Sequence, residues 1–264
     1  MTGTSSNAEA GRVAVVSGAA SGIGRGIAEV LAERGWQVAA VDKNADGLEQ
    51  IAGGPITPVV ADLTRSSDCR RVAEEAGRLG PLKGLVNCAG RELHGSVTEM
   101  PEEEWDLVID TNLKTIYLLS HHCLPVMAQA GGGSVVNISS IQALATQTSV
   151  AAYAASKGAV ISLSRAMALD HAPEGIRVTC VCPGTIDTPL VRANAEYYNP
   201  GDPEAQLREW GGMHAVGRIG TPHEVGRVVA FLLSDDASFI TGSIFRRTAD
   251  IWRTRLEAGR RRAS

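Results

Sequence analysis

The sequence predicts an α/β fold: one domain built on a doubly wound parallel sheet with helices on both faces. Short β-branched runs alternate with helical patterns along the 264-residue chain. Such alternation is typical of parallel strands joined by helical crossovers. These crossovers are right-handed, which places helices on both faces of the sheet. No internal repeat or linker divides the chain.

The elements follow one another in a regular order. The predicted strands are Arg12–Ser17, Gln37–Asp42, Ile56–Ala61, Leu85–Asn87, Ser134–Ser139, Arg177–Val181 and Phe239–Phe245. The predicted helices are Ile23–Arg34, Ser66–Leu79, Glu102–Ala130 and Tyr153–His171. An insertion at about 188–213 interrupts the order after the sixth strand. Open α/β sheets bind ligands at that end of a strand, so we predict a lid there, with a surface loop as the alternative.

Composition indicates a soluble, cytoplasmic protein. Hydrophobic residues make up 44% of the chain, and no apolar run reaches the ~18 residues typical of a membrane span. Residues 1–11 lack the features of a signal peptide and are expected to be a disordered leader. The five cysteines are scattered; Cys180 and Cys182 share one face of a strand, where two buried thiols are favoured over a metal or redox site. Reduced thiols fit a cytosolic compartment.

The net charge of −4 is unevenly distributed. Residues 246–264 carry seven arginines and two acids (+5), whereas the remaining chain has 18 basic and 27 acidic residues (−9). An acidic body argues against a nucleic-acid surface. We therefore predict a catalytic domain over residues 12–245, followed by an atypical basic tail over 246–264.

A glycine-rich turn separates the first strand from the first helix. Gly18, Gly22 and Gly24 give a G-x-x-x-G-x-G spacing. Small residues let the backbone approach a pyrophosphate, and the helix N-terminus offers free N–H groups and a positive dipole. The motif predicts a Rossmann-like nucleotide site, with a merely structural turn as the alternative.

Asp42 ends the second strand, where nucleotide folds place an acid on the ribose hydroxyls. Its carboxylate repels a 2′-phosphate, and the turn has Ser21 where a basic residue could offset that repulsion. These features predict NAD in preference to NADP. Lys43 argues against this preference, because its ammonium group could swing toward a 2′-phosphate. An N-cap or an exposed loop acid is the alternative for Asp42.

Tyr153 and Lys157 lie four residues apart in Tyr-Ala-Ala-Ser-Lys, so on a helix they share a face. A tyrosine titrates near ~10 unaided, and a neighbouring positive charge lowers that pKa toward the range of general acid–base catalysis. Four tyrosines and four lysines give roughly 0.06 such pairs by chance, so the spacing is informative. A pair that faces solvent is the alternative.

The order of motifs resembles the short-chain dehydrogenase/reductase family. It runs from the glycine turn through Asp42, Asn87-Cys-Ala-Gly90, Asn112, Ser140 and the Tyr153–Lys157 pair to Pro183-Gly184. The resemblance implies Tyr153 as acid/base, Ser140 as the holder of the substrate oxygen, Lys157 as the ribose ligand and Asn112 in a proton relay. Ser139 is the neighbouring alternative, but the thirteen-residue spacing to the tyrosine selects Ser140. The nucleotide contacts implied are Gly18, Ser21, Gly22, Ile23, Gly24, Asp42, Asp62, Leu63, Asn87, Ala89, Gly90, Tyr153, Lys157, Pro183, Gly184, Ile186 and Thr188.

The reaction expected is the NAD-dependent interconversion of a secondary alcohol and a ketone, without a metal. The alternative is a nucleotide-binding sensor or scaffold without turnover. The substrate-binding residues predicted are Ser140, Gln142, Tyr153 and His94, and Arg91, Glu92, Gln147 and the lid aromatics are further candidates for the cleft. Such polar groups favour a sugar, polyol or hydroxy acid, although a hydrophobic ring alcohol remains open. The resemblance also implies a homodimer or homotetramer through the two long central helices.

The C-terminus departs from the family pattern. After Phe245 the family continues with a Val-Asp-Gly-Gly-like segment, whereas this chain reads Arg-Arg-Thr-Ala-Asp-Ile-Trp-Arg. In a shifted reading frame, codons allowed for Phe245–Arg253 can spell Pro-Pro-Asp-Gly-Gly-Tyr-Leu-Ala. A frameshift in the gene or its clone is our hypothesis; a basic partner-binding tail and an ordinary divergent tail are the alternatives.

Overall fold

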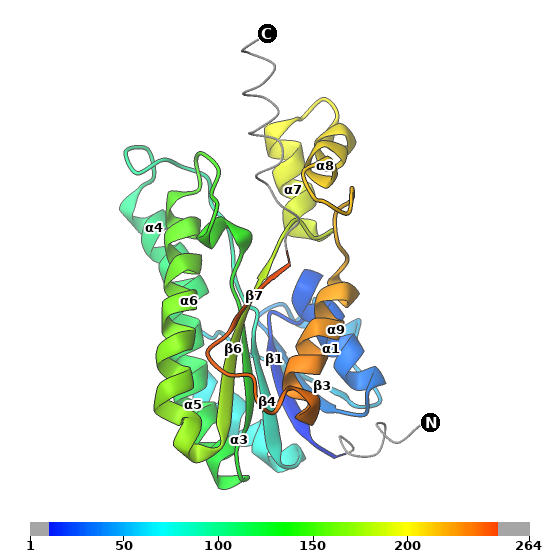
Figure 1. Cartoon of the computed structure of the whole chain (residues 1–264), viewed down its shortest axis with the longest axis vertical. Helices are drawn as coiled ribbons and strands as arrows, with labels where there is room; N and C mark the ends of the chain where they lie inside the picture. Colours follow the sequence, from blue (N-terminus) through cyan, green and yellow to red (C-terminus); the bar gives the residue numbers. More distant parts are fainter. Residues whose placement is uncertain (1–10, 248–264) are drawn as a thin grey trace.

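The computed structural model describes residues 11–247. Most of the predicted leader (1–10) and tail (248–264) lies outside these residues. The centre is a seven-stranded sheet in the order β3-β2-β1-β4-β5-β6-β7, with every described pair parallel (Figure 1). The strands are β1 (Val13–Ser17), β2 (Gln37–Asp42), β3 (Ile56–Val60), β4 (Leu82–Asn87), β5 (Gly133–Ile138), β6 (Ile176–Pro183) and β7 (Ile244–Arg247). The predicted α/β, doubly wound sheet is confirmed.

Helices cover both faces of the sheet, and the alternation of strand residues explains why. In β1, Ala14 and Val16 join the core beneath α1 (Gly22–Glu33) and α9 (Pro222–Leu233), whereas Val13 and Val15 join the core beneath α3 (Ser66–Leu79) and α5 (Thr115–Gln129). Every residue of β1 is therefore buried, as expected for a strand covered on both faces. The helices are α1 (Gly22–Glu33), α2 (Ala45–Glu49), α3 (Ser66–Leu79), α4 (Glu102–Ile109), α5 (Thr115–Gln129), α6 (Ala151–His171), α7 (Pro189–Tyr198), α8 (Pro203–Gly212) and α9 (Pro222–Leu233).

The helix predicted over Glu102–Ala130 is interrupted. A π-helical segment, Asp110–Lys114, separates α4 from α5 and carries Asn112. π-helical turns are rare and occur frequently at functional sites. The prediction of one regular helix is wrong here, because apolar periodicity does not report the polar tertiary contacts of a single buried side chain.

The last strand starts later than predicted. Phe239 is fully exposed and Gly242 has a φ of +65°, so the chain turns before β7 begins at Ile244. The N–H of Gly242 donates to the carbonyl of Val178 (2.8 Å), which closes this turn against β6. β7 then extends to Arg247, two residues past the predicted end of the domain.

The interruption predicted between β6 and α9 folds as the two short helices α7 and α8. Each starts at a proline and is capped by the residue before it, since Thr188 accepts from the N–H of Val191 (3.2 Å) and Asp202 from that of Ala205 (2.9 Å). Figure 1 places both helices beyond the end of β6. Within residues 11–247 no helix is long and apolar enough to cross a membrane.

Candidate active site

The turn between β1 and α1 relies on glycine for close main-chain contact. Gly18 and Gly22 have positive φ values of +69° and +55°. A Cβ on Gly18 would lie 2.9 Å from the Cα of Ala89, and one on Gly24 would overlap the carbonyl of Gly18. α1 starts at Gly22, and its N-cap Ser21 makes no side-chain capping bond. The first N–H groups of α1 are therefore left to solvent or to a ligand.

The carboxylate of Asp42 braces this turn from the end of β2. Its Oδ2 accepts from the N–H of Ala20 (3.2 Å) and its Oδ1 from that of Asn44 (3.0 Å). Asp42 and Lys43 both line the cavity next to the glycine turn. An acid and a base therefore lie together where a ribose is expected.

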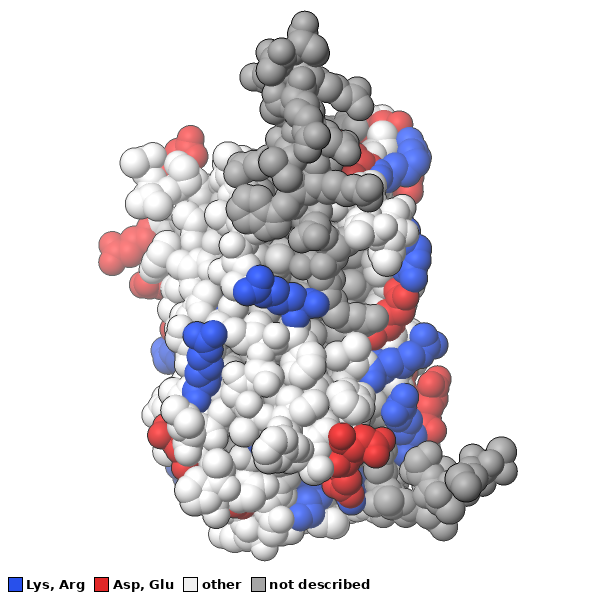
Figure 2. Space-filling model, in the orientation of Figure 1, with Lys and Arg blue, Asp and Glu red and all other residues white. Residues whose placement is uncertain are grey.

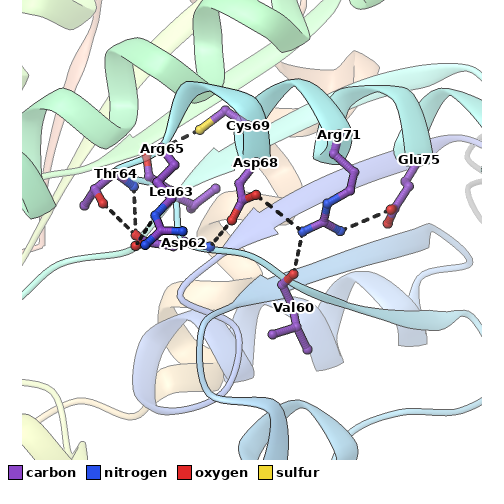
Figure 3. Close-up of polar contacts among 9 residues, drawn as sticks. All are labelled: Val60, Asp62, Leu63, Thr64, Arg65, Asp68, Cys69, Arg71 and Glu75. Atoms are coloured by element: carbon purple, nitrogen blue, oxygen red, sulfur yellow. Dashed lines mark hydrogen bonds and ion pairs between the residues drawn. The ribbon is translucent and has the colours of Figure 1, made fainter.

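A polar network fixes Asp62 after β3 (Figure 3). The N–H of Asp62 donates to Asp68 Oδ2 (2.8 Å), while the Thr64 hydroxyl donates to Asp62 Oδ1 (2.7 Å) and lowers the pKa of that carboxyl. Arg71 of α3 donates to the carbonyl of Val60 (2.7 Å) and pairs with Asp68 (3.9 Å). The start of α3 therefore holds the main chain that leaves β3.

These segments enclose a first cavity of about 340 Å³ at the carboxyl ends of the strands. The predicted nucleotide contacts on its wall are Gly18, Ser21, Gly22, Ile23, Gly24, Asp42, Asp62, Leu63, Ala89, Gly90, Tyr153, Lys157 and Thr188. Pro183, Gly184 and Ile186 line a second cavity instead.

Asn87, which was also predicted as a nucleotide contact, lines neither the first nor the second cavity. It is buried, and its Nδ2 donates to Asn137 Oδ1 (2.8 Å) and Ser120 Oγ (3.3 Å). Ser17, which sequence reasoning missed, accepts from the N–H groups of Cys88 (2.9 Å) and Ala89 (3.1 Å). A hydroxyl at the end of a strand just before a glycine turn is a signal that could have identified Ser17.

The second cavity measures about 300 Å³ and adjoins the first. The residues that line both are Ile23, Ser139, Tyr153, Thr188 and Leu190. Ser140 and Gln142 line only the second, and so do Trp210 and Met213 from the region predicted as a lid. Tyr153 thus lies where the two cavities meet.

The two neighbouring serines have different partners. Ser139 is buried and donates to the carbonyl of Lys157 (2.7 Å). Ser140 accepts from the N–H of Gln142 (3.1 Å) and lies close enough to Tyr153 to lower the pKa of its phenol. Ser140 therefore has the geometry to share a substrate oxygen with Tyr153, whereas Ser139 is occupied within the protein.

Burial dominates the ionisation of Tyr153 and Lys157. It raises the pKa of the phenol and lowers the pKa of the ammonium, because both charged forms lose solvation. The Nζ of Lys157 donates to the carbonyl of Ile138 (2.9 Å) and lies 5.8 Å from the centre of the Tyr153 ring. The expected lowering of the Tyr153 pKa by Lys157 is not met in this structure, where desolvation outweighs the other contributions.

Asn112 anchors the loop that follows Gly90. Its Oδ1 accepts from the N–H of Arg91 (2.7 Å), and its Nδ2 donates to the carbonyl of Arg91 (2.9 Å) and to Ser156 Oγ (3.0 Å). Both amide hydrogens are used. A proton relay through these hydrogens would have to break a bond that holds the loop.

The loop after Gly90 also meets α7. Asn194 donates to Glu92 Oε1 (3.1 Å), and its own Oδ1 lies 3.3 Å from His94 Nε2. The His94 ring stacks on Tyr197 with the ring centres 4.0 Å apart, so it lies against α7 rather than on the wall of the second cavity. Tyr198 adds hydrogen-bond contacts to His94 (3.4 Å) and to Gln147 (3.2 Å).

Two cysteines and a histidine near the site are buried within the protein. Cys180 and Cys182 are buried free thiols. His214, also missed from the sequence, accepts from the N–H of Thr185 (3.2 Å), and burial lowers its pKa. Within the described part of the chain no three His, Cys, Asp or Glu side chains are grouped to hold a metal ion.

Comparison with known proteins identifies the family of the chain. A family model described as enoyl-(acyl carrier protein) reductase matches residues 18–247. A cyclohexanol dehydrogenase of Acinetobacter sp. (strain SE19) is 38% identical over 241 residues, covering 88% of this chain and 91% of that enzyme.

Solved structures agree. The ligand-free aldohexose dehydrogenase of Thermoplasma acidophilum has a TM-score of 0.86 and 38% identity, covering 93% of this chain and 94% of that one. The L-sorbose reductase of Gluconobacter frateurii, solved with NADPH and L-sorbose, has a TM-score of 0.88 and 26% identity over 94% of this chain and 99% of that one. Together with the glycine turn and the Ser140–Tyr153–Lys157 group, these matches show that the chain belongs to the short-chain dehydrogenase/reductase family, whose members are NAD(P)-dependent oxidoreductases acting on CH–OH groups.

Proposed function

We propose that the protein interconverts a secondary alcohol and its ketone with NAD, using Tyr153 as the acid/base. The observation that carries this proposal is the place of Tyr153, at the junction of the cavity next to the glycine turn and a second cavity that is lined by Ser140. A phenol at such a junction can exchange a proton with a substrate oxygen whose carbon faces the nucleotide. Lys157 lies on the nucleotide side of the same junction.

Each residue of the site is assigned one role in this reaction. The bound nicotinamide supplies or accepts the hydride. Ser140 holds the substrate oxygen, Tyr153 gives or takes its proton, and Lys157 binds the ribose. Because burial keeps Tyr153 protonated, its resting form is the acid that ketone reduction requires. Asn112 serves the site chiefly by fixing the Arg91 main chain.

We infer that the first cavity binds the dinucleotide, with a preference for NAD over NADP. The glycine turn admits a pyrophosphate, because side chains at Gly18 and Gly24 would collide with neighbouring backbone. Asp42 lines the cavity and disfavours a 2′-phosphate by charge repulsion. The L-sorbose reductase was solved with NADPH, and Lys43 beside Asp42 is the group that a phosphate would use here.

The second cavity supports a polar substrate, with a sugar or polyol ahead of a hydroxy acid or a ring alcohol. Gln142, Gln147 and Asn194 offer hydrogen bonds on its wall. Two structural relatives are named for sugars, and one sequence relative is named for cyclohexanol. We assign α7 and α8 as the lid of this cavity, since both contribute to its wall.

We further infer a cytoplasmic homodimer or homotetramer. Helices α4 and α5, which together cover the first of the two predicted interface helices, expose Trp105, Leu107 and Tyr117, and this supports an interface there. Figure 2 shows few charged side chains on the visible face over α6, the second predicted interface helix, which is compatible with a contact there. The free thiols support a reducing compartment. The mass of the protein in solution tests the oligomer.

The replacement Tyr153→Phe tests the mechanism. It removes only the phenolic oxygen, so turnover is expected to fall by about a thousandfold or more, within the range that acid–base catalysis contributes, while NADH binding measured by nicotinamide fluorescence stays nearly unchanged. Tyr117→Phe is the matched control, because this tyrosine is exposed on α5 and lines neither cavity. Equal activity of Tyr153→Phe and the wild type would refute the proposal.

A further inference from the structure

Glu92 is the feature of the second cavity that the proposed chemistry does not use. It lines that cavity together with Tyr153 and Ser140, from the loop that Asn112 anchors. One of its oxygens, Oε1, accepts from Asn194 of α7 (3.1 Å). Among the described residues no fully buried side-chain oxygen or nitrogen lacks a partner. The other oxygen, Oε2, has no partner within that part of the chain and is therefore open to the cavity.

The charge on the wall of this cavity has one sign. Glu92 is its only carboxylate, and no lysine or arginine of the described chain lines it. Burial favours the neutral form of all three titratable groups on the wall, which are Glu92, Tyr153 and His214, and with a pKa of about 7 Glu92 carries its charge only above that pH. The wall also has uncharged hydrogen-bonding side chains, which include Ser140, Gln142, Thr146, Gln147 and Asn194. A substrate therefore meets a carboxylate and several amides and hydroxyls, without a cation from the wall.

Resting on the proposed function, we propose that Glu92 selects the substrate class: its free carboxylate oxygen accepts hydrogen bonds from hydroxyl groups of a neutral polyhydroxylated alcohol, such as a sugar or polyol, and disfavours substrates that carry a carboxylate or phosphate. The hydroxy acid among the candidate substrates is thereby excluded.

Two physical effects act together at this position. Hydrogen bonds to an ionised acceptor are shorter and stronger than those between neutral groups, so a substrate hydroxyl gains at Oε2. An anionic group in the same poorly solvated space meets an unpaired like charge, which is the repulsive element that specificity requires. A ring alcohol without further hydroxyls gains nothing from Glu92 and leaves its oxygen without the hydrogen bond.

A purely structural role is the competing explanation, because Glu92 Oε1 also ties the loop to α7. The variant Glu92→Gln separates the two roles. A glutamine retains an oxygen that accepts from Asn194, but it has no charge and only one carbonyl acceptor. Glu209→Gln is the matched control, since it neutralises an exposed carboxylate on α8 that contacts Gln206 (3.1 Å).

The experiment measures kcat/KM for a polyol (glucitol), a sugar acid (gluconate) and cyclohexanol, with NAD at saturation and at about pH 8.5, where Glu92 is ionised. In Glu92→Gln the glucitol-to-cyclohexanol ratio is expected to fall about tenfold or more, and the gluconate-to-cyclohexanol ratio to rise by a similar factor. Glu209→Gln is expected to leave both ratios within about twofold of the wild type. Ratios that do not move in Glu92→Gln, or a wild type that prefers gluconate, would overturn the assignment of Glu92.

Failure of the proposed function has a different signature. If the wild type binds NADH but turns over none of the three substrates, the proposed reaction is refuted, and calorimetric titration of the NADH complex with glucitol and gluconate decides the role of Glu92. Tighter binding of glucitol, lost in Glu92→Gln, supports the inference. Equal or tighter binding of gluconate contradicts it.

Discussion

Replacing Glu92 by glutamine is expected to change how stability depends on pH. Burial raises the pKa of Glu92 from an ordinary value of 4.5 to about 7. The hydrogen bond from the Asn194 amide and the charge of Lys157 lower this pKa, but they offset only part of the increase. Tyr153 and Tyr198 also face the carboxylate. The folded state thus keeps this proton to a higher pH than the unfolded chain does. As pH rises from about 4.5 to about 7, ionisation stabilises the unfolded chain, and the wild type loses stability.

The magnitude follows from the two pKa values. They differ by about 2.5, and each pKa unit corresponds to about 1.4 kcal/mol. The full effect above pH 7 is therefore about 3 kcal/mol, of which about 2.5 kcal/mol develops between pH 5 and pH 8. A glutamine does not ionise, so Glu92→Gln should gain this amount relative to the wild type over that interval.

Urea unfolding of both proteins at pH 5 and pH 8, at one protein concentration, measures the difference. Glu224→Gln is the control of opposite sign, because the Arg218 hydrogen bond lowers the pKa of Glu224 to about 2. The stabilisation from Glu224 is present above its ordinary pKa and is lost only as pH falls toward 2. Glu224→Gln should thus be less stable than the wild type by a similar amount at pH 5 and pH 8. Parallel pH dependence of the wild type and Glu92→Gln would refute the desolvation of Glu92.

Three further predictions concern the nucleotide cavity. Asp42→Asn keeps an oxygen that can accept hydrogen bonds from the turn, but it removes the negative charge. The ratio of NADH to NADPH affinity, measured by fluorescence titration, should therefore fall about tenfold. An unchanged ratio means that Asp42 does not face the ribose. Gly24→Ala places a Cβ on the carbonyl of Gly18 and should abolish NADH binding, whereas Gly158→Ala, with open space around its Cβ, should retain binding and add about 1 kcal/mol of stability. Asp68→Ala frees the main chain at Asp62 and should weaken NADH binding about threefold to tenfold, with kcat little changed; an unaltered affinity would show that the network around Asp62 is not needed.

Much of the fold could be predicted from the sequence, because its signals are local. β2 and α3 have the predicted bounds, since an apolar run or an amphipathic period repeats over the whole element. The π-helical segment at Asp110–Lys114 could not be predicted this way, because it accompanies contacts from Asn112 to residues 21 and 44 positions away in sequence. The start of β7 was misplaced because apolar Phe239 reads as a strand residue but lies in an exposed turn.

In the candidate site, too, local features could be predicted from the sequence and long-range contacts could not. Tyr153 and Lys157 belong to a short motif on one helix, so their shared face follows from spacing alone. Glu92 and Asn194 are 102 residues apart in sequence, and they come into contact because α7 packs against the loop after β4. No periodicity reports such a pair, and a glutamate in a polar loop is ordinarily exposed. The burial that makes Glu92 informative is visible only in three dimensions.

The two halves of the site are held by different kinds of structure, and this bears on how specificity can vary. Ser140 and Tyr153 are positioned by the end of β5 and the start of α6, which belong to the sheet and its core. Glu92 is positioned by a loop that depends on a few polar contacts, from Asn112 and Asn194 and from the N–H of Gly95 to the carbonyl of Ser149 (2.8 Å). Ser149 itself has a φ of +59°, a strained conformation for a residue with a side chain. If Glu92 and Tyr153 have the roles proposed above, substitutions in this loop are expected to change the substrate without disturbing Tyr153, and relatives of the chain are named for substrates as different as cyclohexanol and aldohexoses.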